Sequence, residues 1–191
     1  MRLLLVLVSA IAAATAVHAA ESSAAEEAAL ARGRPFVEVH ADTDGDGGLI
    51  RGAIDVAASP EAVFRVVTDC DLAPKMVATL KSCRVLERDP SGRWDVREQV
   101  SKMTLLPSIR NVFRSEYDPP GHVRFWRVDG DLKVYEGEWR IEPMAEGSRV
   151  TYESRVSTPF HVPRSFARMS LRYQVSQALV ALRREAEART R

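Results

Sequence analysis

The longest regular pattern of apolar and polar positions lies at the C-terminal end of the chain. From Val162 to about Glu187, apolar residues recur at helical spacing along two lines. One line is Phe166, Met169, Tyr173 and Val180, and the other is Leu171, Val175, Leu179 and Leu182. This spacing predicts one long amphipathic helix with a wide apolar stripe, which needs a broad partner to pack against.

The segments before this helix alternate between apolar and polar residues, as strands do. The expected strands are Phe36–His40, Leu49–Ala57, 82–88, 94–101, 109–117, 123–129, 134–142 and 150–157. Gly, Pro and Asp fill the short turns between the later strands, which indicates an antiparallel meander. Ser59-Pro60-Glu61 has the residues of a helix start, and a second short helix is expected from about Asp71.

This order of elements predicts an α+β fold. Two short helices follow the first strands, and a curved antiparallel sheet of about seven strands wraps around the long C-terminal helix. A sheet that encloses a single helix leaves a cavity between the two layers. The architecture therefore favours a protein that binds a small apolar molecule.

The first nineteen residues have the pattern of a secretory signal peptide. Arg2 precedes the apolar stretch Leu3–Ala16, and Val17-His18-Ala19 fits the small-x-small cleavage rule. The alternative is an uncleaved anchor, but the stretch is shorter than the ~20 residues of a membrane-spanning helix. Residues 20–34 are rich in Ala and Glu but have no apolar face, which predicts a frayed helix or a flexible segment before a single domain at 35–188. We expect an exported protein of the bacterial periplasm or cell envelope.

Charge and cysteine content exclude several classes of function. With 27 Lys and Arg against 26 Asp and Glu, the chain lacks the basic excess of a general nucleic-acid binder. The Asp-rich stretch Asp42–Gly48 lacks the final Glu of a calcium loop, so a hairpin turn is favoured. No metal or cofactor is expected. Cys70 and Cys83 are the only cysteines; in an exported protein we expect a disulfide, with two buried thiols as the alternative.

Several short segments support the fold in combination. They are Ser59-Pro60-Glu61-Ala62-Val63-Phe64, Leu80–Leu86, Tyr135-Glu136-Gly137-Glu138-Trp139 and Val150-Thr151-Tyr152, together with the final helix. From about Leu49 to Arg184 the chain resembles the START-like, helix-grip (SRPBCC) superfamily, which includes polyketide cyclases and coenzyme Q-binding proteins. The resemblance implies the helix-grip fold, which hosts lipid carriers, enzymes and ligand sensors alike.

The candidate binding residues follow from strand and helix phase. Tyr135 and Trp139 share the apolar face of one strand, and Tyr152 follows the same logic on the next. On the final helix, Phe166, Met169 and Tyr173 are expected to line the cavity, with polar atoms of the aromatic residues available to a ligand. Core packing is the alternative for each of these residues.

Two further features raise the alternative of transient contact with a membrane. Leu105 and Leu106 form an apolar hairpin tip, which either gates the cavity or enters a membrane, or else folds under the final helix. Arg164, Arg168 and Arg172 form a basic line that suits anionic headgroups, or is a solvated helix face.

Three functions remain open on the sequence alone. The leading hypothesis is an exported, non-enzymatic protein that binds a hydrophobic small molecule, such as a lipid, an isoprenoid or a quinone-like compound. The second is an enzyme of the polyketide cyclase/dehydratase kind, with Tyr135, Tyr152 and Glu98 as its acid/base candidates. The third is a protein-interaction module whose cavity has collapsed.

Overall fold

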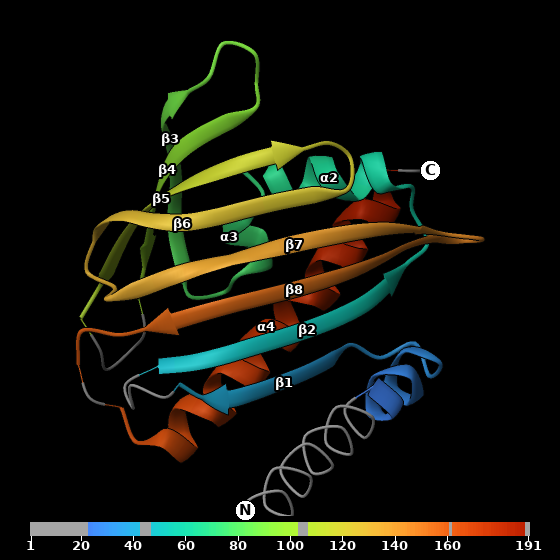
Figure 1. Ribbon diagram of the computed structural model, residues 1–191, viewed down its shortest axis with the longest axis horizontal. Coiled ribbons are helices and arrows are strands. Elements are labelled where there is room, and N and C mark those ends of the chain that lie inside the picture. The colour runs from blue at the N-terminus through green and yellow to red at the C-terminus, as the bar shows by residue number, and fades with distance from the viewer. Residues whose placement is uncertain (1–22, 43–46, 103–106, 161, 190–191) are drawn as a thin grey trace, which may run out of the picture.

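One antiparallel sheet organises the structure, a computed structural model that describes residues 23–42, 47–102, 107–160 and 162–189. Within these ranges the strands are β1 (Phe36–Ala41), β2 (Gly47–Val56), β3 (Leu80–Arg88), β4 (Trp94–Ser101), β5 (Ile109–Asp118), β6 (His122–Gly130), β7 (Val134–Met144) and β8 (Gly147–Ser157). Their order across the sheet is β1-β2-β8-β7-β6-β5-β4-β3 (Figure 1). The predicted meander is confirmed, and each of the eight segments expected as strands forms a strand of the sheet. The signal-like residues 1–19 and the tip residues Leu105 and Leu106 lie outside the described residues.

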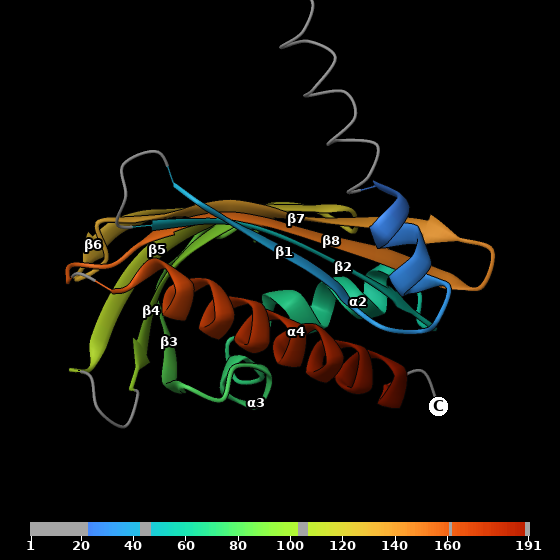
Figure 2. The same cartoon turned by 90° about the horizontal axis from the view of Figure 1, so that it is seen from below.

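Three helices cover one face of this sheet. They are α2 (Pro60–Thr68), α3 (Ala73–Met76) and α4 (Arg164–Ala188), and Figure 2 shows all three on the same side. As predicted, Ser59 caps α2, because its hydroxyl accepts a hydrogen bond from the backbone N–H of Ala62. No helix in the described part of the chain is both long and apolar enough to cross a membrane.

The long helix packs closely on β2 because two glycines leave room for it. A Cβ atom on Gly48 would lie 3.0 Å from Leu171 Cδ1, and one on Gly52 would lie 3.0 Å from Leu179 Cδ1. Leu179 and Leu182 are fully buried there, in a core that also contains Ile54, Val63 and Val150. The C-terminal half of α4 is therefore fixed to the sheet.

The prediction of a single wide apolar stripe on α4 is wrong. Leu171 and Leu179 face the sheet, whereas Met169 and Tyr173 are 65% and 66% exposed. Two residues along an α-helix correspond to a rotation of about 200°, so the two apolar lines lie on opposite sides of the helix. Phe166 and the other members of its line point outward.

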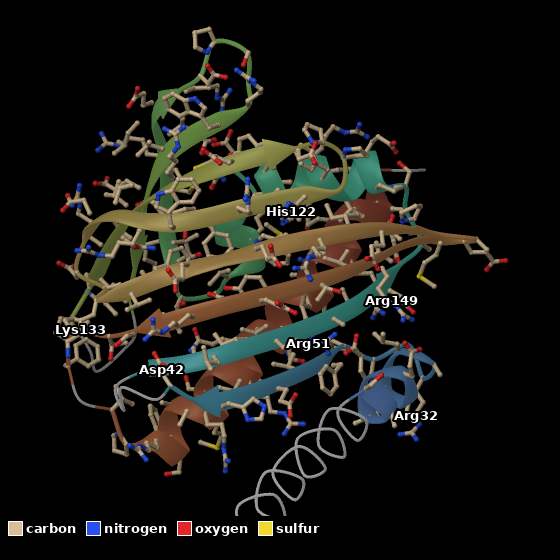
Figure 3. All side chains as sticks on the ribbon, viewed as in Figure 1. Arg32, Asp42, Arg51, His122, Lys133 and Arg149 are labelled. Carbon is tan, nitrogen blue, oxygen red and sulfur yellow. A yellow bond between two sulfur atoms is a disulfide. The ribbon has the colours of Figure 1, made fainter. Side chains whose placement is uncertain are left out.

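The segment before β1 is also more ordered than its composition predicts. Residues 23–30 form a helix in which Leu30 is buried. Glu26 pairs with Arg51 on β2, and Glu27 lies 2.6 Å from Arg149 on β8; both arginines are labelled in Figure 3. The prediction of a frayed helix or a flexible segment over 20–34 did not include these contacts, because their partners are distant in sequence.

Candidate ligand-binding cavity

A cavity of about 350 Å³ lies between α4 and the concave face of the sheet. One wall is a cluster of five aromatic rings, contributed by Phe113, Phe125, Tyr135, Trp139 and Tyr152. The ring centroids of Tyr135 and Phe125 are 4.9 Å apart, and those of Trp139 and Tyr152 are 4.4 Å apart. The structure thus places Tyr135, Trp139 and Tyr152 on the cavity wall, as strand alternation predicted. A role for these residues in binding stays a prediction.

The opposite wall comes from α4 and α3. Leu171, Val175, Ala178 and Leu179 of α4 face the cavity, and Met76 of α3 joins them. Phe166, Met169 and Tyr173 were predicted to line the cavity and do not, because they lie on the exposed side of α4; Phe166 instead lines a second, adjoining hollow. A volume of about 350 Å³ is within the usual range for small-molecule sites. The cavity is therefore open, whereas the third hypothesis, a protein-interaction module, required a collapsed one.

A second hollow, here called the entrance groove, adjoins this cavity at the N-terminal end of α4. Its volume is about 340 Å³, and it is lined in part by His40, Phe160, Arg164, Phe166 and Arg168. It shares five lining residues with the cavity, namely Ile109, Val156, Thr158, Leu171 and Gln174. Because several of its other lining residues are exposed, the groove connects the cavity with the surface.

Strand β4 turns a polar stripe toward the cavity. Arg97, Gln99 and Ser101 line it at alternate positions. Glu98 lies on the other face, where it accepts hydrogen bonds from Arg110, at 2.6 Å, and from Arg84. Its prediction as an acid/base group inside the cavity is therefore wrong. The hydrogen bond from Arg110 is the main reason why the pKa of Glu98 is lowered.

Arg97 is held in place by a buried network. Its Nε donates to Asp95 Oδ1 at 2.9 Å, and its Nη2 donates to the second Asp95 oxygen, to the Tyr117 hydroxyl and to the Thr68 carbonyl. The side chains of Arg97 and Asp95 are only 5% and 2% exposed. Burial alone would lower the pKa of Arg97, but the bond to Asp95 and nearby charges outweigh it, so its pKa is raised. The guanidinium is thus a permanent, internally neutralised charge.

The tyrosines of the cavity give a prediction for alkaline pH. Burial is the main cause that raises the pKa values of Tyr117, Tyr135 and Tyr152. Their folded pKa lies above the unfolded value, so their stabilising effect is complete below about pH 10 and is lost as the pH rises further. We expect the free energy of unfolding to fall by up to about 1.4 kcal/mol per pH unit for each tyrosine. Urea denaturation between about pH 9 and pH 11 measures this slope. The free energy of unfolding of a Tyr135→Phe/Tyr152→Phe variant should fall less steeply with pH. An equal slope in the variant and the wild type would contradict the raised pKa values of these tyrosines.

The predicted cysteine pairing is present in the structure. Cys70 and Cys83 form a disulfide with a Cα–Cα distance of 5.4 Å. The bond joins the connection between α2 and α3 to the edge strand β3. Since Met76 of α3 lines the cavity, the disulfide holds one wall close to the sheet. β1 and β2 pair antiparallel on either side of residues 43–46, and Asp42, just after β1, accepts a hydrogen bond from Arg155 Nε at 2.6 Å.

Comparison with known proteins identifies the family. Residues 56–183, from the end of β2 through most of α4, match the polyketide cyclase / dehydrase and lipid transport family. The chain belongs to this family. It is a START-like protein, and the resemblance seen in its sequence is confirmed. No curated protein matches the chain.

Solved structures agree with this fold. A STAR-related lipid transfer protein of Xanthomonas axonopodis is 18% identical with a TM-score of 0.68, over 80% of this chain and 93% of that one. A protein of Thermus thermophilus is 23% identical with a TM-score of 0.65, over 75% and 99%. An aromatase/cyclase of a Streptomyces species is 17% identical with a TM-score of 0.61, over 76% and 96%. At these identities the likeness shows the shared helix-grip fold.

Proposed function

We propose that this START-like protein is a non-enzymatic carrier of a hydrophobic small molecule: a lipid, an isoprenoid or a quinone-like compound. The observation that carries the proposal is the cavity of about 350 Å³, aromatic on one side and aliphatic on the other. Burial of apolar ligand surface supplies roughly 25 cal/mol per Å² before the costs of association. The family's description and the lipid transfer protein among its structural relatives support the same class of ligand.

The proposed place of action is the periplasm or the cell envelope. The signal-like pattern of residues 1–19 supports export, and the Cys70–Cys83 disulfide suits an oxidising compartment. N-terminal sequencing of the protein isolated from a periplasmic fraction tests this. A mature chain that begins near Ala20 is expected, whereas an intact Met1 in the cytoplasmic fraction would contradict it.

We further propose that the carrier exchanges its ligand at an anionic membrane surface. Phe166, Met169 and Tyr173 present an exposed apolar line on α4, next to the entrance groove. Between Arg164 and Arg184 the helix carries five arginines and no Asp or Glu. Exposed apolar side chains beside arginines suit a surface of anionic headgroups above acyl chains. Docking there would bring the groove to the bilayer.

This docking gives a test with vesicles. Wild-type protein is expected to co-sediment with vesicles that contain phosphatidylglycerol, and binding should weaken as salt is added. A triple variant, Phe166→Ser/Met169→Ser/Tyr173→Ser, should bind at least about tenfold more weakly, since each side chain contributes apolar burial. Leu86→Ser/Val128→Ser is the control, because these two residues are also exposed but lie on β3 and β6.

Two results would contradict the membrane proposal. One is equal vesicle binding by the triple variant and the control variant. The other is self-association of the wild type that only the triple variant loses, which would assign the outer face of α4 to a second copy of the chain.

The carrier function itself is tested by uptake. Delipidated protein is incubated with vesicles made from an envelope lipid extract that includes quinones, and is then separated and extracted. We expect about one hydrophobic molecule per protein. Protein that returns without any such molecule under saturating conditions would count against the proposal.

An enzyme of the cyclase or dehydratase kind is the second candidate, and one observation favours it. Arg97 and the Tyr117 hydroxyl, which accepts a hydrogen bond from it, both line the cavity, where the guanidinium could polarise a carbonyl group of a substrate. The raised pKa values of Tyr117, Tyr135 and Tyr152 keep these phenols protonated near neutral pH, so they act as donors and not as bases. Turnover of a poly-β-ketone that Tyr135→Phe/Tyr152→Phe abolishes would favour the enzyme over the carrier.

A further inference from the structure

One polar group inside the cavity has no partner in the protein. Asn111 of β5 is 6% exposed and lines the cavity. Its Oδ1 is fully buried and accepts no hydrogen bond from the described residues. Buried carbonyl oxygens are nearly always paired, because removing them from water without a replacement bond is unfavourable. Because Asn111 lines the cavity, a molecule bound there can supply the partner that this oxygen lacks.

The neighbours of Asn111 define a small polar site. Gln99 of β4 is directly opposite Asn111 in the antiparallel register, so the two amide side chains leave the sheet side by side. Gln99 contacts Cys83 Sγ at 3.8 Å through its Nε2, a weak interaction for an amide. The apolar residues Phe113, Ile109 and Leu132 also line the cavity. The site thus offers a hydrogen-bond acceptor, Asn111 Oδ1, and amide N–H donors within apolar surroundings.

The charge of the cavity restricts what can bind there. Among the described residues that line it, Arg97 is the only charged one, and Asp95 already neutralises it. An anionic group at Asn111 would be buried without a counter-charge, and its oxygens would face an oxygen of the amide. A hydroxyl group has neither problem, since it donates to Oδ1 and accepts from an amide N–H.

From this arrangement we infer that the ligand is a neutral amphiphile with a hydroxyl-bearing end, such as a long-chain or polycyclic alcohol or a phenol, and that Asn111 selects it. The inference rests on the proposed carrier function and specifies its ligand class. The hydroxyl end lies at Asn111 and Gln99, and the apolar body lies against the aromatic cluster and α4. Ligands that would place a phosphate or a carboxylate at Asn111 are excluded as preferred ligands.

A series of three probes tests this inference: hexadecanol, its methyl ether and hexadecanoate at about pH 8. Affinities are measured by displacement of an environment-sensitive fluorophore from the delipidated full chain. The wild type is expected to prefer the alcohol over both other probes by at least about tenfold, since only the alcohol donates to Asn111 Oδ1. Asn111→Leu should reduce this preference to less than about threefold while the ether binds as well as before.

Ser101→Ala is the matched control, because Ser101 lies on the same polar stripe but is opposite Ile109, and not Asn111, in the strand register. It should keep the preference for the alcohol. Equal binding of alcohol and ether by the wild type would overturn the inference, since Asn111 would then only hold a water molecule, and would leave the carrier function intact. A preference that persists in Asn111→Leu would overturn it as well. Failure of all three probes to displace the fluorophore would overturn both the inference and the carrier function.

Discussion

Replacement of Asp95 by alanine is expected to lower the free energy of unfolding by about 3–5 kcal/mol, the cost of leaving one partner of a buried ion pair alone. Asp95 and Arg97 are both almost completely buried, and Asp95 is the only carboxylate that binds Arg97 among the described residues. The Arg97 charge would remain in the interior without compensation. Urea denaturation, followed by circular dichroism, measures the loss.

Two further variants show whether the charge is responsible. Asp129→Ala removes a carboxylate that is 66% exposed and pairs with Arg110, so a loss below about 1 kcal/mol is expected. The double variant Asp95→Ala/Arg97→Met should recover most of the stability, since it leaves no unpaired charge in the cavity wall. A loss below about 1 kcal/mol in Asp95→Ala would show that the pair is not held as the structure describes.

Filling the cavity should abolish ligand binding without unfolding the protein. Ala178 lies on α4 and faces the cavity, so Ala178→Phe places a ring where the ligand body lies. We expect the affinity for hexadecanol to fall at least about a hundredfold, with a loss of stability of about 1–3 kcal/mol from overpacking. The displacement measurement described above gives the affinity.

The neighbouring position provides the control for this variant. Gln177 is exposed on the outer side of the same helix, so Gln177→Phe adds the same ring outside the cavity. The Gln177→Phe variant should bind hexadecanol with the affinity of the wild type. Unchanged binding by Ala178→Phe, with its fold intact, would place the ligand elsewhere on the protein.

Local patterns in the sequence predicted the fold and one wall of the cavity. Alternation along β7 placed Tyr135 and Trp139 on the inner face, and the start of α2 at Ser59 followed from its capping residues. Both signals depend on neighbouring residues only, so they can be read without a structure. The START-like resemblance added the topology that joins these elements.

The polar side of the cavity could not be predicted in the same way. In β4, Val96 and Val100 alternate with Arg97 and Gln99, so the usual rule of apolar residues inside selects the wrong face. The rule fails here because a cavity wall needs polar groups that a packed core does not. Asn111 gave no signal of its own, since its significance comes from an unpaired oxygen that only the packing of β4 and β5 reveals.

On α4 the spacing of apolar residues predicts both apolar lines, but it does not show that only one of them faces the sheet. The line of Phe166, Met169 and Tyr173 lies half a turn from the line that contacts the sheet. Its side chains therefore contribute to the outer surface instead of the cavity. This difference moves three predicted ligand-binding residues, Phe166, Met169 and Tyr173, to the proposed membrane-docking face.

Native mass spectrometry of the protein purified from the cells that produce it tests the central claim most directly. The wild type is measured beside Ala178→Phe, and an organic extract of each is analysed in parallel. The carrier function predicts a discrete added mass on the wild type, which reappears in its extract as a neutral, hydroxyl-bearing amphiphile and is missing from the variant. A wild-type protein that carries no added mass under gentle conditions, or the same added mass on both proteins, would contradict a carrier that holds its ligand in this cavity.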